Sequence, residues 1–117
     1  MSLYFVNQEK ADLYDSLIDV FNQLFKEVKD LGKKKPDTTL SSAKVKLINR
    51  VLSDVIECME GQVFAKYLDL LDDEVLPHYS DAILILSQHD GALQAFRERH
   101  FGFYNGDSQW VIRKKQK

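Results

Sequence analysis

The sequence predicts a mainly α-helical protein, a compact bundle of about four helices with a short C-terminal β-hairpin. Apolar residues recur three and four apart through most of the chain, which is the spacing of an amphipathic helix. After Gly102 this pattern gives way to two short runs around Asn105-Gly106, a pair typical of a type I′ hairpin turn. We therefore expect a single helical domain over 1–117, with helices at 8–31, 42–60, 62–76 and 80–101, a hairpin at 102–112 and a frayed basic tail at 113–117.

The helix expected over 42–60 should lie at the centre of the bundle, because its apolar surface exceeds half of its circumference. One stripe on this helix consists of Val45, Ile48, Leu52, Val55 and Met59. Its charges oppose its own dipole, with Lys44 and Lys46 early and Glu57 and Glu60 late. The position of these two carboxylates requires an explanation.

The other helices have recognisable ends. Asn7 is expected to cap the first helix and Gly32 to end it in a left-handed conformation. Pro77 should stop the third helix, and Ser80 should cap the fourth, with Tyr79 and Leu84 as a hydrophobic staple. Gly91 leaves open whether 80–101 is one helix or two.

Composition bounds the functions that are compatible with this chain. The formal net charge of −2 argues against a general nucleic-acid binder. Cys58 is the single cysteine, so no internal disulfide can form, and we expect it to be a buried, unreactive thiol. No apolar run approaches the roughly 20 residues that span a bilayer. These features favour a cytoplasmic protein, and no cofactor is expected.

Two pairs of carboxylates could bind a metal. Glu57 and Glu60 are three residues apart, as are Asp69 and Asp72, so each pair would project from one face of its helix. If the two helices faced each other, the four carboxylates could hold Mg²⁺. This layout resembles the all-α nucleotide pyrophosphatases of the MazG type, over residues 57–72 alone. The resemblance implies a Mg²⁺-dependent hydrolase, whereas a solvated acidic face is the structural alternative.

The C-terminal segment interleaves aromatic and basic residues. The candidate binding residues are Arg97, Phe101, Phe103, Tyr104 and Trp110. Aromatic and arginine side chains are common anchors of protein interfaces. They could equally close the end of the bundle or, with the lysines at 33–35 and the tail, contact a nucleic acid.

No catalytic set stands out from the sequence, and we therefore expect a non-catalytic adaptor or regulator. Its partner would be another protein or a second copy of this chain, with a homodimer slightly favoured. The magnesium-dependent hydrolase and a weak nucleic-acid binder remain as alternatives.

Overall fold

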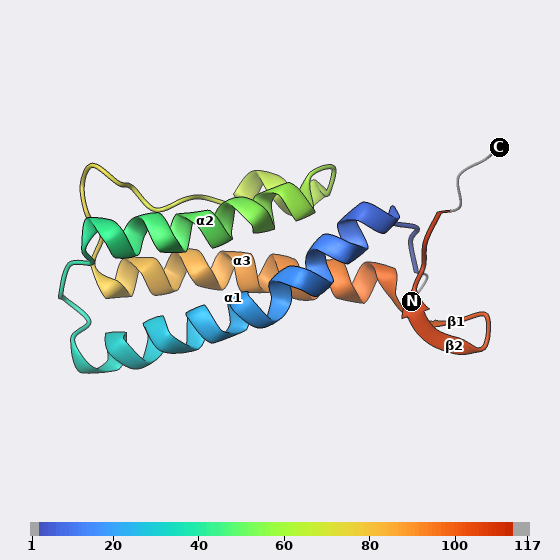
Figure 1. The fold of residues 1–117 in the computed structure, drawn as a ribbon, viewed down its shortest axis with the longest axis horizontal. Helices are drawn as coiled ribbons and strands as arrows, with labels where there is room; N and C mark the ends of the chain where they lie inside the picture. The colour runs from blue at the N-terminus through green and yellow to red at the C-terminus, as the bar shows by residue number, and fades with distance from the viewer. Residues whose placement is uncertain (1–2, 114–117) are drawn as a thin grey trace.

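The computed structural model describes residues 3–113, and this part of the chain is mainly helical (Figure 1). It contains three α-helices, not about four, and a two-stranded antiparallel hairpin. In chain order the elements are α1 (Gln8–Lys34), α2 (Ser42–Met59), the short 3₁₀ helix η1 (Val63–Tyr67), α3 (Tyr79–His100), β1 (Phe101–Tyr104) and β2 (Asp107–Trp110).

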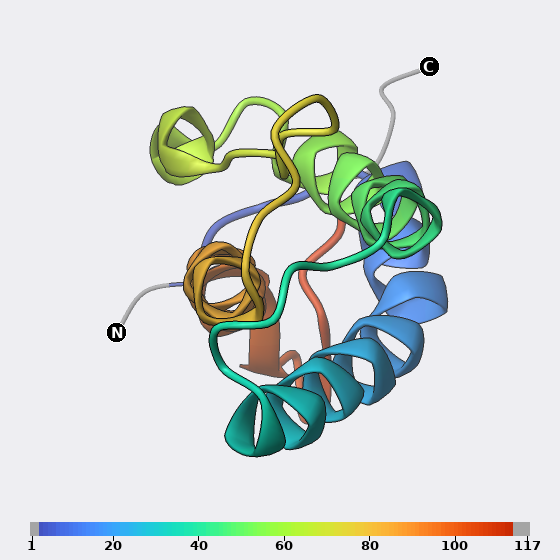
Figure 2. The same ribbon diagram turned by 90° about the vertical axis from the view of Figure 1, so that its left-hand side faces the viewer.

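The three helices lie along the long axis of the molecule and form a triangle when viewed end-on (Figures 1 and 2). Helices α2 and α3 run in the same direction and α1 runs in the opposite one (Figure 1). The hairpin and the start of the chain lie together at one end of the bundle. A single hydrophobic cluster between the helices includes Phe21, Leu52, Leu86 and Phe96.

Helix α1 begins as expected and ends differently. The side chain of Asn7 caps it by accepting a hydrogen bond from the Lys10 backbone N–H at 2.8 Å. The prediction that Gly32 ends the helix is wrong, because α1 continues to Lys34. Gly32 is instead buried where α1 meets α3, and a Cβ atom there would lie 2.5 Å from Cδ1 of Ile83. The close approach of two helices thus explains this glycine.

Helix α2 confirms the stripe predicted for it. Its five members are all buried, namely Val45, Ile48, Leu52, Val55 and Met59. Ser41 caps the start of the helix through its side chain. Gly61, with φ of +88°, lets the chain turn sharply just after the helix ends.

The helix predicted over 62–76 does not form. Only Val63–Tyr67 is helical there, as the 3₁₀ helix η1. Residues 68–78, which we call the strap, return to the far end of the bundle without helical structure (Figure 1). The 18 residues of α2 span about 27 Å. Eleven residues of the strap can cover that distance when extended, but as a helix they would reach only about 16 Å.

Side chains from both neighbouring helices hold the strap. Asn49 on α2 accepts a hydrogen bond from the Leu71 backbone N–H at 2.8 Å and donates one to its carbonyl at 2.9 Å. On α3, Nε2 of His89 lies 2.8 Å from the Asp69 carbonyl oxygen. These bonds satisfy backbone groups that a helix would otherwise have satisfied internally.

Helix α3 is continuous through Gly91, so the segment predicted as helical over 80–101 forms one helix and not two. Its N-cap is His78, not Ser80, and the Asp81 carboxylate accepts a hydrogen bond from the His78 backbone N–H. The predicted staple is also wrong. Tyr79 is buried, but Leu84 is 66% exposed because it points away from the core.

The hairpin and its type I′ turn are confirmed. Asn105 and Gly106 have φ of +51° and +86°, and Phe101 pairs with Trp110 across the strands. The N-terminal segment joins the same end of the molecule, since Val6 forms a parallel bridge with Ile112. Arg113, at the start of the predicted frayed tail, donates its backbone N–H to Val6. Residues 114–117 lie outside the described part of the chain.

Candidate functional site

Trp110 is an anchor of the bundle end. Its ring centroid lies 5.1 Å from that of Tyr14 and 5.7 Å from that of Phe96, and the ring of Phe101 packs edge-on against it at 5.1 Å. The indole N–H donates to the Asp15 carboxylate at 3.1 Å. Both Phe101 and Trp110 are half-buried. Two of the five candidate binding residues therefore attach the hairpin to the helices.

Phe103 and Tyr104, at the turn of the hairpin, are the exposed aromatic members of the candidate set, and Arg97 is exposed as well. Phe103 is 75% exposed and Tyr104 is 37% exposed. The N-terminal segment adds two more exposed rings, because Phe5 packs edge-on against Tyr104 with centroids 6.4 Å apart and Tyr4 precedes it. The apolar sequence of this segment predicts that it crosses the core or pairs with a strand, and the structure shows it paired beside the hairpin.

Three arginines lie over aromatic rings at this end of the molecule, two of them over the exposed rings and one over Phe101. Arg97 lies over the ring of Phe101 at 4.2 Å from its centroid. Arg99 lies over Tyr4 at 4.4 Å, and Arg113 lies 6.0 Å from the centroid of Phe5. We call the whole surface the aromatic tip, which consists of Tyr4, Phe5, Phe103, Tyr104, Arg97, Arg99 and Arg113.

The structure does not assemble the four candidate metal ligands. Glu57, Glu60, Asp69 and Asp72 are all exposed, and the second pair lies in the strap, not on a helix. Asp72 instead accepts hydrogen bonds from the backbone N–H groups of Val75 and Glu74, which lower the pKa of its carboxyl. Within residues 3–113, no group of three or more His, Cys, Asp or Glu side chains is placed to hold a metal ion. The pyrophosphatase resemblance requires two facing helices that carry the two pairs, but Asp69 and Asp72 do not lie on a helix.

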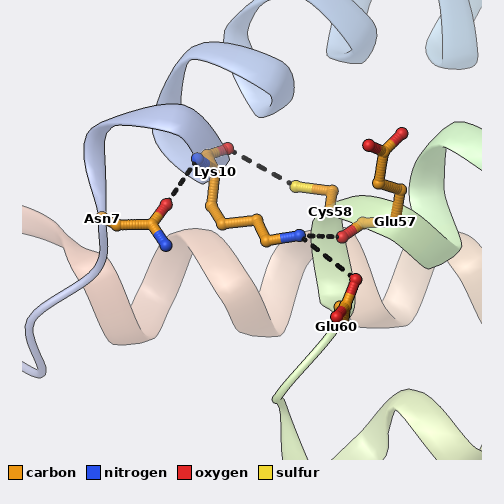
Figure 3. A network of polar contacts seen from close by, with 5 residues as sticks. All are labelled: Asn7, Lys10, Glu57, Cys58 and Glu60. Carbon is orange, nitrogen blue, oxygen red and sulfur yellow. Dashed lines mark hydrogen bonds and ion pairs between the residues drawn. The ribbon is translucent and has the colours of Figure 1, made fainter.

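Lys10 explains how α2 tolerates acidic residues at its C-terminal end (Figure 3). Its amino group donates a hydrogen bond to the carbonyl of Glu57, one of the last carbonyls of the helix, and lies 3.8 Å from the Glu60 carboxylate. The side chain of Lys10 is 21% exposed, whereas that of Glu60 is 79% exposed. A cation from α1 thus stabilises the negative end of the α2 dipole. These contacts give Glu60 and the end of α2 a structural role.

Cys58 is buried as expected. Its thiol points toward the carbonyl of Lys10, with the sulfur 3.6 Å from that oxygen (Figure 3). Burial raises the pKa of the Cys58 thiol to about 11, so the nucleophilic thiolate is scarce at neutral pH. This environment is that of a structural cysteine.

Two histidines are buried in separate places. His89 holds the strap, and His100 bridges the chain ends, with Nδ1 at 2.7 Å from the Tyr4 carbonyl and Nε2 at 3.0 Å from the amide nitrogen of Gln62. Burial is the largest cause of a lowered pKa in both, so both are neutral near pH 7. In this form each ring donates one hydrogen bond to a backbone carbonyl. Both therefore serve to fix irregular segments.

The basic residues proposed for nucleic-acid contact lie far apart. Lys33 and Lys34 end α1, at the opposite end of the bundle from the hairpin (Figure 1). The tail at 114–117 lies outside the described residues. The structure therefore offers no continuous basic surface joining residues 33–35 to Arg113.

Comparisons with family models, curated proteins and solved structures found no match for this chain. Within the described residues, none of the helices is both long enough and apolar enough to cross a membrane. A proposal about the function of this protein therefore rests on the chemistry of its own surface.

Proposed function

We propose that this protein is a non-catalytic, cytoplasmic adaptor or regulator that binds a protein partner, or a second copy of itself, through the aromatic tip. The observation that carries the proposal is the exposure of Phe103, at 75%, at the end of the molecule that also exposes the rings of Tyr4, Phe5 and Tyr104. Leaving large apolar rings in water is unfavourable, and burying them against a partner would recover that free energy.

The composition of the tip supports the same function. Aromatic residues and arginine are enriched in protein interfaces, where they act as anchors. The rings of Phe5 and Tyr104 already pack against each other, and Arg99 is stacked on Tyr4. Such side chains lose little conformational freedom on binding, so more of the contact energy is available for affinity. A buried, unreactive Cys58 is in keeping with a cytoplasmic setting.

The test replaces the exposed rings and leaves the bundle anchor intact. The double variant Phe103→Ser, Tyr104→Ser should lose self-association in light scattering, or lose its partners in a pull-down with the tagged protein. Helix content by circular dichroism should not change, because neither ring belongs to the core. Leu84→Ser, which removes a large apolar side chain that is 66% exposed on α3, is the matched control. Association that survives the double variant would contradict the proposal.

A further inference from the structure

An apolar groove runs along the outer face between α1 and α2. Two adjoining hollows form it, with cavity volumes of about 150 and 440 Å³. Both are lined by Leu24, Glu27 and Leu47, so they are adjacent. The deeper one reaches the core residues Leu40 and Ile48.

The walls of this groove expose large apolar side chains on both helices. Val20 and Leu31 on α1 are 55% and 44% exposed, and Leu47 on α2 is 51% exposed. Val20, Leu24 and Leu31 are separated by four and seven residues, and Leu47 and Val51 by four. Each wall is therefore one helical row, and the groove between two such rows fits the apolar stripe of another helix.

The charged residues on the rim of the groove are two carboxylates on α1 and one lysine on α2. Among the described residues that line it, Asp19 and Glu27 carry negative charge and Lys44 carries positive charge. The amino group of Lys44 already donates to the Tyr79 hydroxyl at 2.9 Å. The α1 side of the groove therefore presents carboxylates beside an apolar floor, which complements basic residues that flank an apolar stripe.

We propose that the α1–α2 groove binds a basic amphipathic helix from a partner protein. The incoming helix would occupy the position of a fourth helix in the bundle. Its apolar stripe would cover Val20, Leu24 and Leu47, and lysine or arginine residues beside the stripe would face Asp19 and Glu27. A second copy of this chain fits less well, because it would bring the same two carboxylates to the contact. The groove is a surface separate from the aromatic tip.

The test uses the full chain and a fluorescently labelled synthetic peptide. A helix of about 18 residues matches the roughly 27 Å length of α2. The peptide carries leucines at helical spacing and lysines on either side of that stripe, and a scrambled peptide of the same composition is its control. Fluorescence anisotropy gives the affinity, and circular dichroism shows whether the peptide becomes helical on binding.

We expect Leu47→Ser to weaken binding of the designed peptide about tenfold, because one apolar anchor of the wall is lost. The double variant Asp19→Asn, Glu27→Gln should weaken it at low salt and reduce its salt dependence. Leu84→Ser on α3 should leave the affinity unchanged. The tip variant Phe103→Ser, Tyr104→Ser should also leave it unchanged, which separates this proposal from the function proposed for the tip.

Three results would overturn the proposal. The scrambled peptide could bind as tightly as the designed one, or Leu84→Ser could weaken binding as much as Leu47→Ser does. Alternatively, light scattering could show that the wild-type chain self-associates and that Leu47→Ser abolishes this association, which would make a second copy the occupant.

Discussion

The two flanks of α2 are treated differently by the rest of the chain. On the side of α3, the strap at 68–78 and η1 cover the helix, and Leu71 of the strap is only 5% exposed (Figure 2). On the outer side of α1, the groove leaves Leu47 half-exposed. Helix α2 presents apolar side chains on both flanks. The presence of apolar surface alone therefore does not decide which flank the rest of the chain covers.

The difference lies in the polar groups that each flank offers. The strap can lie on the covered flank because Asn49 and His89 satisfy its backbone. The open groove is lined mostly by apolar side chains, and two of its polar ones already pair with a neighbour, Gln23 with Glu27 and Lys44 with Tyr79. A helix, whose backbone is satisfied internally, can cover such a flank without that help.

The largest expected difference in stability is between the same substitution, leucine to alanine, made on each of the two flanks. Leu71→Ala should lower the free energy of unfolding by about 2–4 kcal/mol, because it empties a buried site. Leu47→Ala should change it by less than about 0.5 kcal/mol, because that side chain is already half in water. Urea unfolding of both variants measures the difference. Equal effects would mean that the groove is closed in solution.

A second substitution removes the side-chain clamp of the strap. Asn49→Ala leaves the N–H and the carbonyl of Leu71 without their partner, which should cost about 2 kcal/mol of stability. The matched control is Asn22→Ala, at an exposed position of α1, where we expect a change within about 0.5 kcal/mol. Hydrogen exchange should show faster exchange at Leu71 in Asn49→Ala. Unchanged exchange there would show that packing alone holds the strap.

A third substitution tests the contact between Lys10 and the C-terminal end of α2. Lys10→Met keeps the apolar stem but removes the hydrogen bond to the Glu57 carbonyl, and thermal unfolding should report a loss of about 1 kcal/mol. Glu60→Gln should stay within about 0.5 kcal/mol, because its ion pair is exposed and weak. A larger loss for Glu60→Gln would reverse the roles assigned to the two contacts.

The smallest effect is a pH dependence of the covered flank. Burial lowers the pKa of His89 below its ordinary 6.5, so the folded protein binds fewer protons than the unfolded chain between the two values. The contribution of neutral His89 is complete above pH 6.5 and is lost as the pH falls toward the folded pKa. His100 shifts in the same direction. Urea unfolding across this range should show a shallower slope in His89→Gln than in the wild-type chain.

Local signals in the sequence predicted much of the fold. Asn7, the α2 stripe and the Asn105-Gly106 turn were correctly interpreted, because each depends on residues close together in the chain. Gly32 misled because a glycine near a helix end has two explanations, a left-handed cap or close packing. The neighbour that favours the second, Ile83, is 51 positions away in sequence.

The candidate sites show the same limit. Phe103 and Tyr104 belong to the predicted interface, and the structure brings Tyr4 and Phe5 to the same end of the molecule because Tyr4 bonds to Arg99 and Val6 pairs with Ile112. Glu57 was placed on a helix correctly and Glu60 lies just past the end of that helix, whereas Asp69 and Asp72 lie in the strap. The groove was missed because apolar periodicity shows which residues could be buried without showing whether another segment covers them.

The sequence by itself determined the mainly helical class, the buried stripe of α2, the isolated thiol and the hairpin turn, since spacing and local backbone preference are sufficient for these. Only the tertiary structure decided that the chain returns along α2 as a strap. Residues 62–76 have helical spacing, but the return path demands more length per residue than a helix provides. Asn49 and His89, distant in sequence, make the extended path possible by bonding its backbone, and the space left beside α1 is the groove.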